Sequence, residues 1–283
     1  MAAATSGATP IIELKDIHVT FKTRTGSLLH PNKVQAVRGL SLRLMPGETI
    51  GIVGESGCGK STTANVICGL QRPTSGSVFF KGEDVTVRTA RQRKEIGRQM
   101  SVVFQDPATA LNARMSVHDQ LMDPMVVHHV GDQASREKRV YDLIGMVGLP
   151  DSVMDALPGQ LSGGQRQRVA IARALSLKPD AIVADEPTSA LDVSVRAQIL
   201  NLLMDLKHDL GLAMVFISHD IQTVRYISDR IIVMNKGQAV EEGPANEVFH
   251  NPKDAYTKLL LGAAPSLLYP DLGAKAPTEE KVK

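Results

Sequence analysis

The chain has 283 residues, enough to bury a large core, and its length suits one large domain with a subdomain. Its 32 basic and 30 acidic residues leave a formal net charge of +2, too mild to indicate nucleic-acid binding. Its two cysteines offer neither a disulfide framework nor a metal site, which fits a reducing cytosol. No apolar run of about 20 residues spans a membrane, and residues 1–10 lack the features of a secretory signal.

The N-terminal region is expected to form antiparallel strands over residues 11–50 and 76–86. Apolar and polar residues alternate from Leu40 to Leu44, which is typical of a strand with one buried face. Residues 23–35 are expected to form an exposed loop between strands.

A glycine-rich motif follows the apolar strand predicted over residues 49–53 and precedes a helix predicted over 61–70, which Gly69 is placed to end. Glycine tolerates the backbone angles that let successive N–H groups wrap a triphosphate. Lys60 supplies a positive charge for the β- and γ-phosphates, and the Ser61 hydroxyl suits Mg²⁺. The motif consists of Gly54, Glu55, Ser56, Gly57, Cys58, Gly59, Lys60 and Ser61, and Thr62 follows it.

The middle of the chain is expected to be helical. Residues 88–98 are basic and are interpreted as the solvated face of a short helix. Residues 106–160 lack buried-strand patterns and include a helix predicted over 135–147. Ser162 is placed to cap another helix, over 163–175, whose N-terminus offers free N–H donors and a positive dipole end. Such an end favours an anion.

Three further apolar strands are followed by polar side chains. Gln105 follows the first, Asp185 and Glu186 end the second, and His219 follows the third. Adjacent carboxylates at a buried strand end need a cation or a proton between them, and Mg²⁺ near Asp185 would leave Glu186 to polarise a water. Taken alone, the two carboxylates could also belong to an ordinary loop. A lone histidine after a strand could also have a structural role. In parallel α/β sheets, however, ligands bind beyond the carboxyl ends of the strands, so these residues are expected to share one site.

In chain order these features resemble the complete ATP-binding cassette of ABC transporters: Walker A (residues 54–61), Q-loop (Gln105), signature (Leu161–Gln165), Walker B (Asp185 and Glu186), D-loop (Ser189–Asp192) and switch histidine (His219). The resemblance covers roughly residues 11–265. It implies an α/β fold of the P-loop NTPase type, with a RecA-like core, an antiparallel β subdomain and an α-helical subdomain. ATP and Mg²⁺ are the implied cofactors. The implied cassette domain is 11–250, with the helical subdomain at about 106–165.

The resemblance also implies roles for individual residues. Glu186, His219, Gln105 and Lys60 are the expected catalytic residues, and Mg²⁺ is expected at Ser61, Gln105 and, through water, Asp185. Phe21 is placed where the family stacks an aromatic ring on adenine, although an ordinary core position is the alternative. ATP is expected to contact Phe21, Gly54, Glu55, Ser56, Gly57, Cys58, Gly59, Lys60, Ser61, Thr62, Gln105, Asp185 and His219. The ATP of a second, head-to-tail cassette is expected to contact Ser162, Gly163, Gly164, Gln165 and Asp192.

Residues 188–195, 224–231 and 251–265 resemble the peptide and nickel import branch of this family. The usual His-Pro-Tyr-Thr of its C-terminal extension is replaced here by the segment from Asp254 to Thr257. The extension is assigned to residues 251–283, and its end is expected to be loosely ordered. The cysteine cluster that holds an iron–sulfur centre in some members is absent from the sequence, so no such cluster is expected.

The resemblance implies the ATP-hydrolysing subunit of a bacterial importer for oligopeptides or dipeptides. Its expected place is peripheral, at the cytoplasmic face of the membrane. Its expected partners are a second cassette, two transmembrane permease subunits and an extracytoplasmic peptide-binding protein; a paralogous heterodimer is favoured over a homodimer, and no nucleic-acid partner is expected. Nickel, glutathione or another solute is the alternative cargo. A soluble ABC ATPase acting on DNA or the ribosome is less favoured, because such proteins typically carry two cassettes or long coiled-coil inserts.

Overall fold

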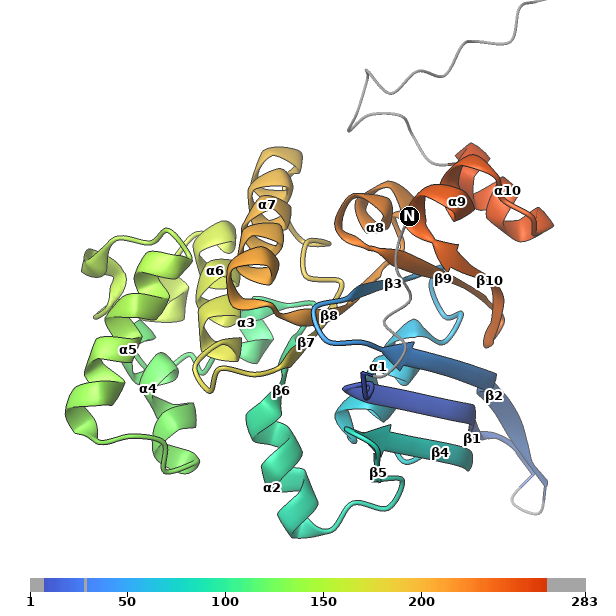
Figure 1. The fold of residues 1–283 in the computed structure, drawn as a ribbon, viewed down its shortest axis with the longest axis horizontal. Helices are drawn as coiled ribbons and strands as arrows, with labels where there is room; N and C mark the ends of the chain where they lie inside the picture. Colours follow the sequence, from blue (N-terminus) through green and yellow to red (C-terminus); the bar gives the residue numbers. More distant parts are fainter. Residues whose placement is uncertain (1–7, 28–29, 264–283) are drawn as a thin grey trace, which may run out of the picture.

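The structure is a computed structural model that describes residues 8–27 and 30–263. A six-stranded sheet at its centre has the order β10-β9-β3-β8-β7-β6 (Figure 1). Its strands are β3 (Thr49–Val53), β6 (Met100–Val103), β7 (Ala181–Asp185), β8 (Ala213–Ser218), β9 (Arg230–Asn235) and β10 (Gln238–Pro244). All neighbouring pairs are parallel except β9 and β10. Every residue of β3 and β8 is buried, which explains why both strands are uninterrupted apolar runs apart from Thr49, Gly51 and Ser218.

A second, antiparallel sheet has the order β2-β1-β4-β5 and is formed by β1 (Ile12–Ser27), β2 (His30–Leu44), β4 (Ser75–Phe80) and β5 (Glu83–Asp84). The prediction of an exposed loop over residues 23–35 was wrong. Strands β1 and β2 continue through most of this stretch as a hairpin, in which Lys22 pairs with Lys33 and Gly26 with Pro31. Threonines in this stretch favour extended backbone, and the long-range pairing of the two strands decides the outcome. Residues 28 and 29 lie outside the described residues.

The remaining elements are helical. They are α1 (Lys60–Cys68), α2 (Ala90–Gln99), α3 (Pro107–Ala110), α4 (Val117–Val127), α5 (Gln133–Met146), the 3₁₀ turns η1 (Asp151–Val153) and η2 (Pro158–Gln160), α6 (Gly163–Ala174), α7 (Val193–Leu210), α8 (Ile221–Ile227), α9 (Ala245–His250) and α10 (Ala255–Ala263). The helices predicted over 61–70, 135–147 and 163–175 are confirmed as α1, α5 and α6. Gly69 adopts a left-handed conformation and ends α1, as expected.

Two hydrophobic cores lie on opposite faces of the six-stranded sheet. One core joins the sheet to α4, α5 and α6, and it contains Leu121, Leu143 and Phe216. The other core joins the sheet to α1 and the antiparallel sheet, and it contains Leu14 and Val215. Met214 and Phe216 belong to the first core while Val215 belongs to the second, so alternate residues of β8 serve opposite faces. Both flanking regions are therefore tied to the strands that carry the predicted polar residues.

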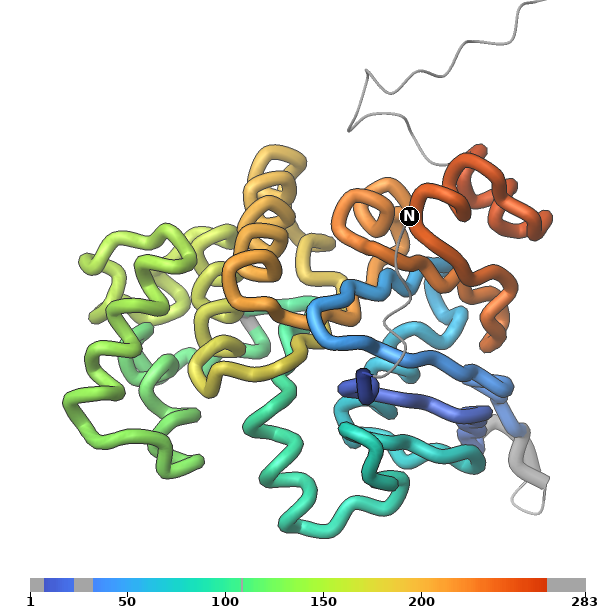
Figure 2. Tube along the Cα trace, in the orientation of Figure 1, coloured from blue at the N-terminus to red at the C-terminus, as the bar shows by residue number. Residues whose placement is uncertain are grey.

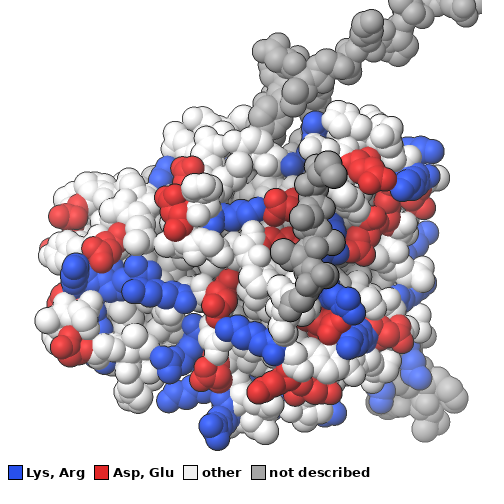
Figure 3. Space-filling view, in the orientation of Figure 1, with Lys and Arg blue, Asp and Glu red and all other residues white. Residues whose placement is uncertain are grey.

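Segments far apart in the sequence meet at this central sheet. Figure 2 shows the chain entering it early with β3 and returning late with β8 and β9, which pair with β3 on either side. On the face drawn in Figure 3, basic and acidic side chains lie interspersed over the described residues. Within those residues, no helix has the length and apolarity needed to cross a bilayer. The end expected to be loosely ordered, from residue 265 onward, lies outside the described residues.

Candidate active site

The glycine-rich loop between β3 and α1 depends on backbone angles that other residues rarely adopt. Gly54, Gly57 and Gly59 have φ angles of 155°, 79° and 109°. A Cβ at Gly54 would lie 2.1 Å from the carbonyl oxygen of Met234, and one at Gly59 would lie 2.3 Å from that of Ala36. The loop therefore fits between β9 and β2 only because these glycines lack side chains.

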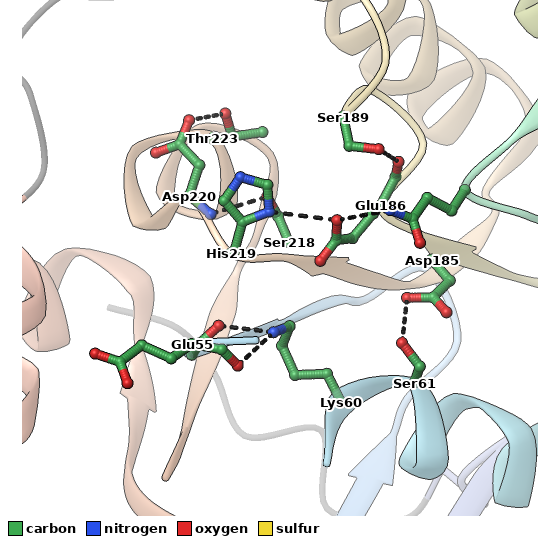
Figure 4. A network of polar contacts seen from close by, with 12 residues as sticks. Glu55, Lys60, Ser61, Asp185, Glu186, Ser189, Ser218, His219, Asp220 and Thr223 are labelled. Carbon is green, nitrogen blue, oxygen red and sulfur yellow. Dashed lines mark hydrogen bonds and ion pairs between the residues drawn. The ribbon is translucent and has the colours of Figure 1, made fainter. Parts of the chain in front are cut away.

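Lys60 is nearly enclosed by this loop, with 4% of its surface exposed. Its Nζ donates to the carbonyl oxygens of Gly54 at 2.7 Å and Glu55 at 3.0 Å (Figure 4). A buried ammonium needs such partners, and an anionic ligand in the loop is a stronger alternative to the two carbonyls.

Three strand ends meet at the Glu186 carboxylate. Gln105 Nε2 donates to Glu186 Oε2 at 3.3 Å, and His219 Nδ1 lies 3.3 Å from the same oxygen. Figure 4 shows His219 reaching toward Glu186 from the loop after β8. The structure therefore brings together the side chains that follow β6, β7 and β8, as the parallel strand order requires.

The backbone of Glu186 is held in an unusual conformation. Its φ angle is 47°, in the left-handed region that few residues other than glycine adopt. Its N–H donates to the carbonyl oxygen of Ile217 at 2.9 Å, and its own carbonyl accepts the Ser189 N–H at 3.2 Å and hydroxyl at 3.1 Å. These contacts hold the Glu186 backbone in a conformation of the kind that often occurs at functional sites.

Asp185, which directly precedes Glu186, accepts a hydrogen bond from the Ser61 hydroxyl at its Oδ1, over 3.3 Å. Burial raises the pKa of Asp185, and the charge of Glu186 raises it further, although Ser61 and Lys60 oppose both effects. A cation between these groups would relieve the cost of the buried charge. Ser61, Asp185 and Gln105 carry hydroxyl, carboxylate and amide oxygens, which are the kinds of ligand that suit Mg²⁺.

A cavity of about 230 Å³ lies beside these groups, although Asp185 and His219 do not line it. It is lined by Ser56, Gly57, Gly59, Lys60, Ser61, Thr62, Gln105 and Glu186. The N-terminus of α1 opens into it, and the N-cap residue Gly59 provides no side chain to occupy the free N–H groups. Free N–H donors, a helix dipole and a lysine together favour a polyphosphate at this place. Gly54, Glu55 and Cys58 belong to the loop but not to the cavity lining, and burial raises the pKa of the Cys58 thiol.

The residues assigned to a second nucleotide do not line this cavity. Ser162 and Gln165 satisfy each other, because the Ser162 hydroxyl accepts the Gln165 N–H at 3.2 Å and Gln165 Oε1 accepts the Ser162 N–H at 2.9 Å. Asp192 likewise caps α7, through the Val195 N–H at 2.9 Å. A Cβ at Gly164 would lie 2.7 Å from Val195, so this glycine lets the N-terminus of α6 pack closely against α7. Gly163 also opens α6 and lies outside the cavity lining.

Phe21 is 41% exposed on β1 and also lies outside the cavity lining, so the alternative of an ordinary core position was wrong.

One contact to the glycine-rich loop could not be predicted from the sequence. The Glu55 N–H donates to the hydroxyl of Tyr256, 201 positions later in the chain, at 3.0 Å. No spacing or periodicity links two residues so far apart, so only the folded chain shows this contact.

Comparison with known proteins places these observations in a family. The family model described as "ABC transporter" matches residues 37–189. The "Oligopeptide transport ATP-binding protein OppF" of Lactococcus lactis subsp. lactis is 43% identical over 258 residues, which cover 91% of this chain and 81% of the relative. The "Dipeptide transport ATP-binding protein DppF" of Escherichia coli is 41% identical over 258 residues, which cover 91% of this chain and 77% of the relative.

Solved structures show the same fold. The dimeric structure of a post-hydrolysis state of the ATP-binding cassette MJ0796, bound to ADP and Pi, superposes with a TM-score of 0.74 and 32% identity over 83% of this chain and 98% of that one. The structure of cbiO1 from Clostridium perfringens, part of an ABC transporter complex, superposes with a TM-score of 0.75 and 27% identity over 86% of this chain and 92% of that one. The fold class predicted from the sequence is confirmed.

Proposed function

The chain belongs to the ABC transporter family as an ATP-binding cassette, and from this premise we propose that it hydrolyses ATP to power the import of oligopeptides or dipeptides. The observation that carries the proposal is the meeting of Gln105, Glu186 and His219 beside the cavity at the N-terminus of α1. The relatives named for oligopeptide and dipeptide transport, at 43% and 41% identity, support the cargo.

Each side chain has a proposed task in the reaction. Lys60 and the N–H groups of the glycine-rich loop bind the phosphates, and Ser61, Asp185 and Gln105 would hold Mg²⁺, which supplies charge neutralisation when bound. Glu186, whose carboxylate is contacted by Gln105 and His219, accepts a proton from the attacking water. His219 donates to the γ-phosphate and so senses its presence. Phe21 stacks on adenine, because its exposed ring is free to receive a base.

A second cassette completes the site. Ser162, Gly163, Gly164, Gln165 and Asp192 lie outside this chain's own cavity, which supports their contact with nucleotide held by a partner cassette. The MJ0796 cassette is dimeric with ADP and Pi bound, which supports such an arrangement. Ser162 is exposed at the N-terminus of α6, where a γ-phosphate would face the helix dipole. We favour a paralogous cassette as the partner, and a second copy of this chain is the alternative.

Docking to two permease subunits is proposed at a groove of about 430 Å³ beside the helical region. Phe104, Leu70 and Val127 line it and are 42%, 65% and 56% exposed. Such a gathering of exposed apolar side chains is typical of a protein interface. Phe104 directly precedes Gln105, so a movement of Gln105 on nucleotide binding would also move Phe104 in the groove. The proposed location is the cytoplasmic face of the membrane, with a peptide-binding protein on the other side.

Uptake measurements test this function. Deletion of the gene should abolish uptake of labelled short peptides, and the purified transporter should hydrolyse ATP faster when a peptide-loaded binding protein is added. A strain carrying the Glu186→Gln variant separates ATP hydrolysis from assembly and should also fail to import. Unchanged peptide uptake in the deletion strain, together with lost uptake of nickel, glutathione or another solute, would overturn the cargo and leave the ATPase assignment intact.

A further inference from the structure

The C-terminal helix α10 reaches the glycine-rich loop through one side chain. The Tyr256 hydroxyl, in the first turn of α10, accepts the Glu55 N–H at 3.0 Å. Glu55, Ser56 and Gly57 are exposed, and a Cβ at Gly57 would meet nothing within 4 Å. This part of the loop therefore has little side-chain packing to hold it, so each hydrogen bond to its backbone matters.

Tyr256 itself is held in place by a series of contacts to the central sheet. The Glu241 carboxylate, on β10, accepts the N–H groups of Lys253 at 2.8 Å and Asp254 at 3.1 Å. Asp254 Oδ1 in turn accepts the Tyr256 N–H at 2.8 Å. The neighbouring Thr257 is fully buried. The first turn of α10 is therefore fixed relative to β10, and it presents the Tyr256 hydroxyl at a fixed position.

The backbone of Glu55 is held from two sides that respond differently to a ligand. On the inner side, its carbonyl oxygen accepts Lys60 Nζ at 3.0 Å, a donor that a triphosphate would compete for. On the outer side, its N–H is held by Tyr256, which does not line the cavity. The contact to Tyr256 can therefore persist while Lys60 exchanges its carbonyl partners for phosphate.

We propose that Tyr256 is a positioning residue for nucleotide binding, which holds the start of the glycine-rich loop in its phosphate-binding conformation before ATP arrives. The inference rests on the proposed function of the same cavity. A loop that is ordered in advance loses less conformational entropy when it binds a ligand, so its affinity is higher. Loss of one neutral hydrogen bond should weaken ATP binding about three- to fivefold. Catalysis after binding should not change, because Tyr256 does not contact the reacting groups.

The Tyr256→Phe variant tests this inference because it removes the hydroxyl and keeps the ring. The dissociation constant and KM for ATP should both rise about three- to fivefold, with kcat within about twofold of the parent. Tyr226→Phe is the matched control, since the Tyr226 hydroxyl donates to Asn201 Oδ1 at 2.7 Å and joins α8 to α7. The control should leave the dissociation constant for ATP unchanged, even if it lowers the Tm by as much as Tyr256→Phe does.

Further outcomes separate this inference from the function on which it rests. Asp254→Ala removes the contact to the Tyr256 N–H and should shift the dissociation constant in the same direction by a smaller factor, so it provides a second test should Tyr256→Phe fold poorly. Equal ATP affinity in the parent, Tyr256→Phe and Asp254→Ala would overturn the role of Tyr256, as would an equal loss in Tyr226→Phe. Failure of the parent itself to bind ATP would instead refute the proposed function.

Discussion

Two helices of this protein begin next to a glycine-rich segment, and their N-termini differ in how their N–H groups are satisfied. The N-cap of α1 is Gly59, which provides no side-chain hydrogen bond. The N-cap of α6 is Ser162, which forms a complete capping box with Gln165. The end of α1 thus keeps its donors for a ligand, whereas α6 satisfies part of its own requirement.

The surroundings of the two N-termini also differ. Lys60 and Glu186 line the cavity at the N-terminus of α1, whereas no residue at the N-terminus of α6 lines that cavity. The dipole of α6 still favours an anion. The N-terminus of α1 can therefore bind a nucleotide within this chain, whereas the N-terminus of α6 is proposed to complete a site whose remaining groups belong to another cassette.

The largest expected effect separates hydrolysis from binding at the end of α1. Glu186→Gln should slow hydrolysis by about 100-fold or more, because the amide cannot accept the proton of the attacking water. ATP binding should persist, and ATP should trap a stable cassette dimer that is visible by size-exclusion chromatography. The exposed Glu83→Gln serves as the control and should behave like the parent. Single-turnover hydrolysis within a few-fold of the parent would remove Glu186 from the proposed role.

The proposed role of the α6 N-terminus is tested by a substitution at Ser162. Ser162→Arg should lower hydrolysis about 100-fold, because the side chain blocks donors that would stabilise charge on the opposite nucleotide. The variant's own affinity for ATP, measured on monomeric protein, should stay at the parent value. Ser116→Arg is the matched control, because Ser116 caps α4 through the Asp119 N–H at 3.1 Å and lies in another helix. If monomeric Ser162→Arg binds ATP much more weakly than the parent while Ser116→Arg does not, the N-termini of α1 and α6 do not serve different nucleotides.

A smaller effect is expected for the lysine at the end of α1. Lys60→Ala should weaken the affinity of this chain for ATP about 10- to 100-fold, because a charged hydrogen bond to phosphate is lost. Equilibrium titration of monomeric protein measures the change. Lys81→Ala, which removes a surface ion pair to Asp180, should leave the affinity unchanged. An affinity for Lys60→Ala within twofold of the parent would contradict the proposed phosphate contact.

Much of the nucleotide site was predictable because its chemistry is local. The left-handed Gly69 that ends α1 and the Ser162 cap of α6 each depend on residues within a few positions. The strands before Gln105, Glu186 and His219 are apolar because they are buried, and parallel strand order then places these side chains at one edge.

The sequence by itself therefore determined the helix caps, the glycine positions of the loop before α1 and the edge of the sheet where polar residues gather. Only the tertiary structure decided that Gln105 and His219 meet at one oxygen of Glu186, that the hairpin of β1 and β2 extends into the expected loop, and that Tyr256 holds Glu55. Local conformation follows from the steric limits and hydrogen-bonding groups of neighbouring residues. Contacts between distant residues depend on how whole elements pack, and no short stretch of sequence carries that information.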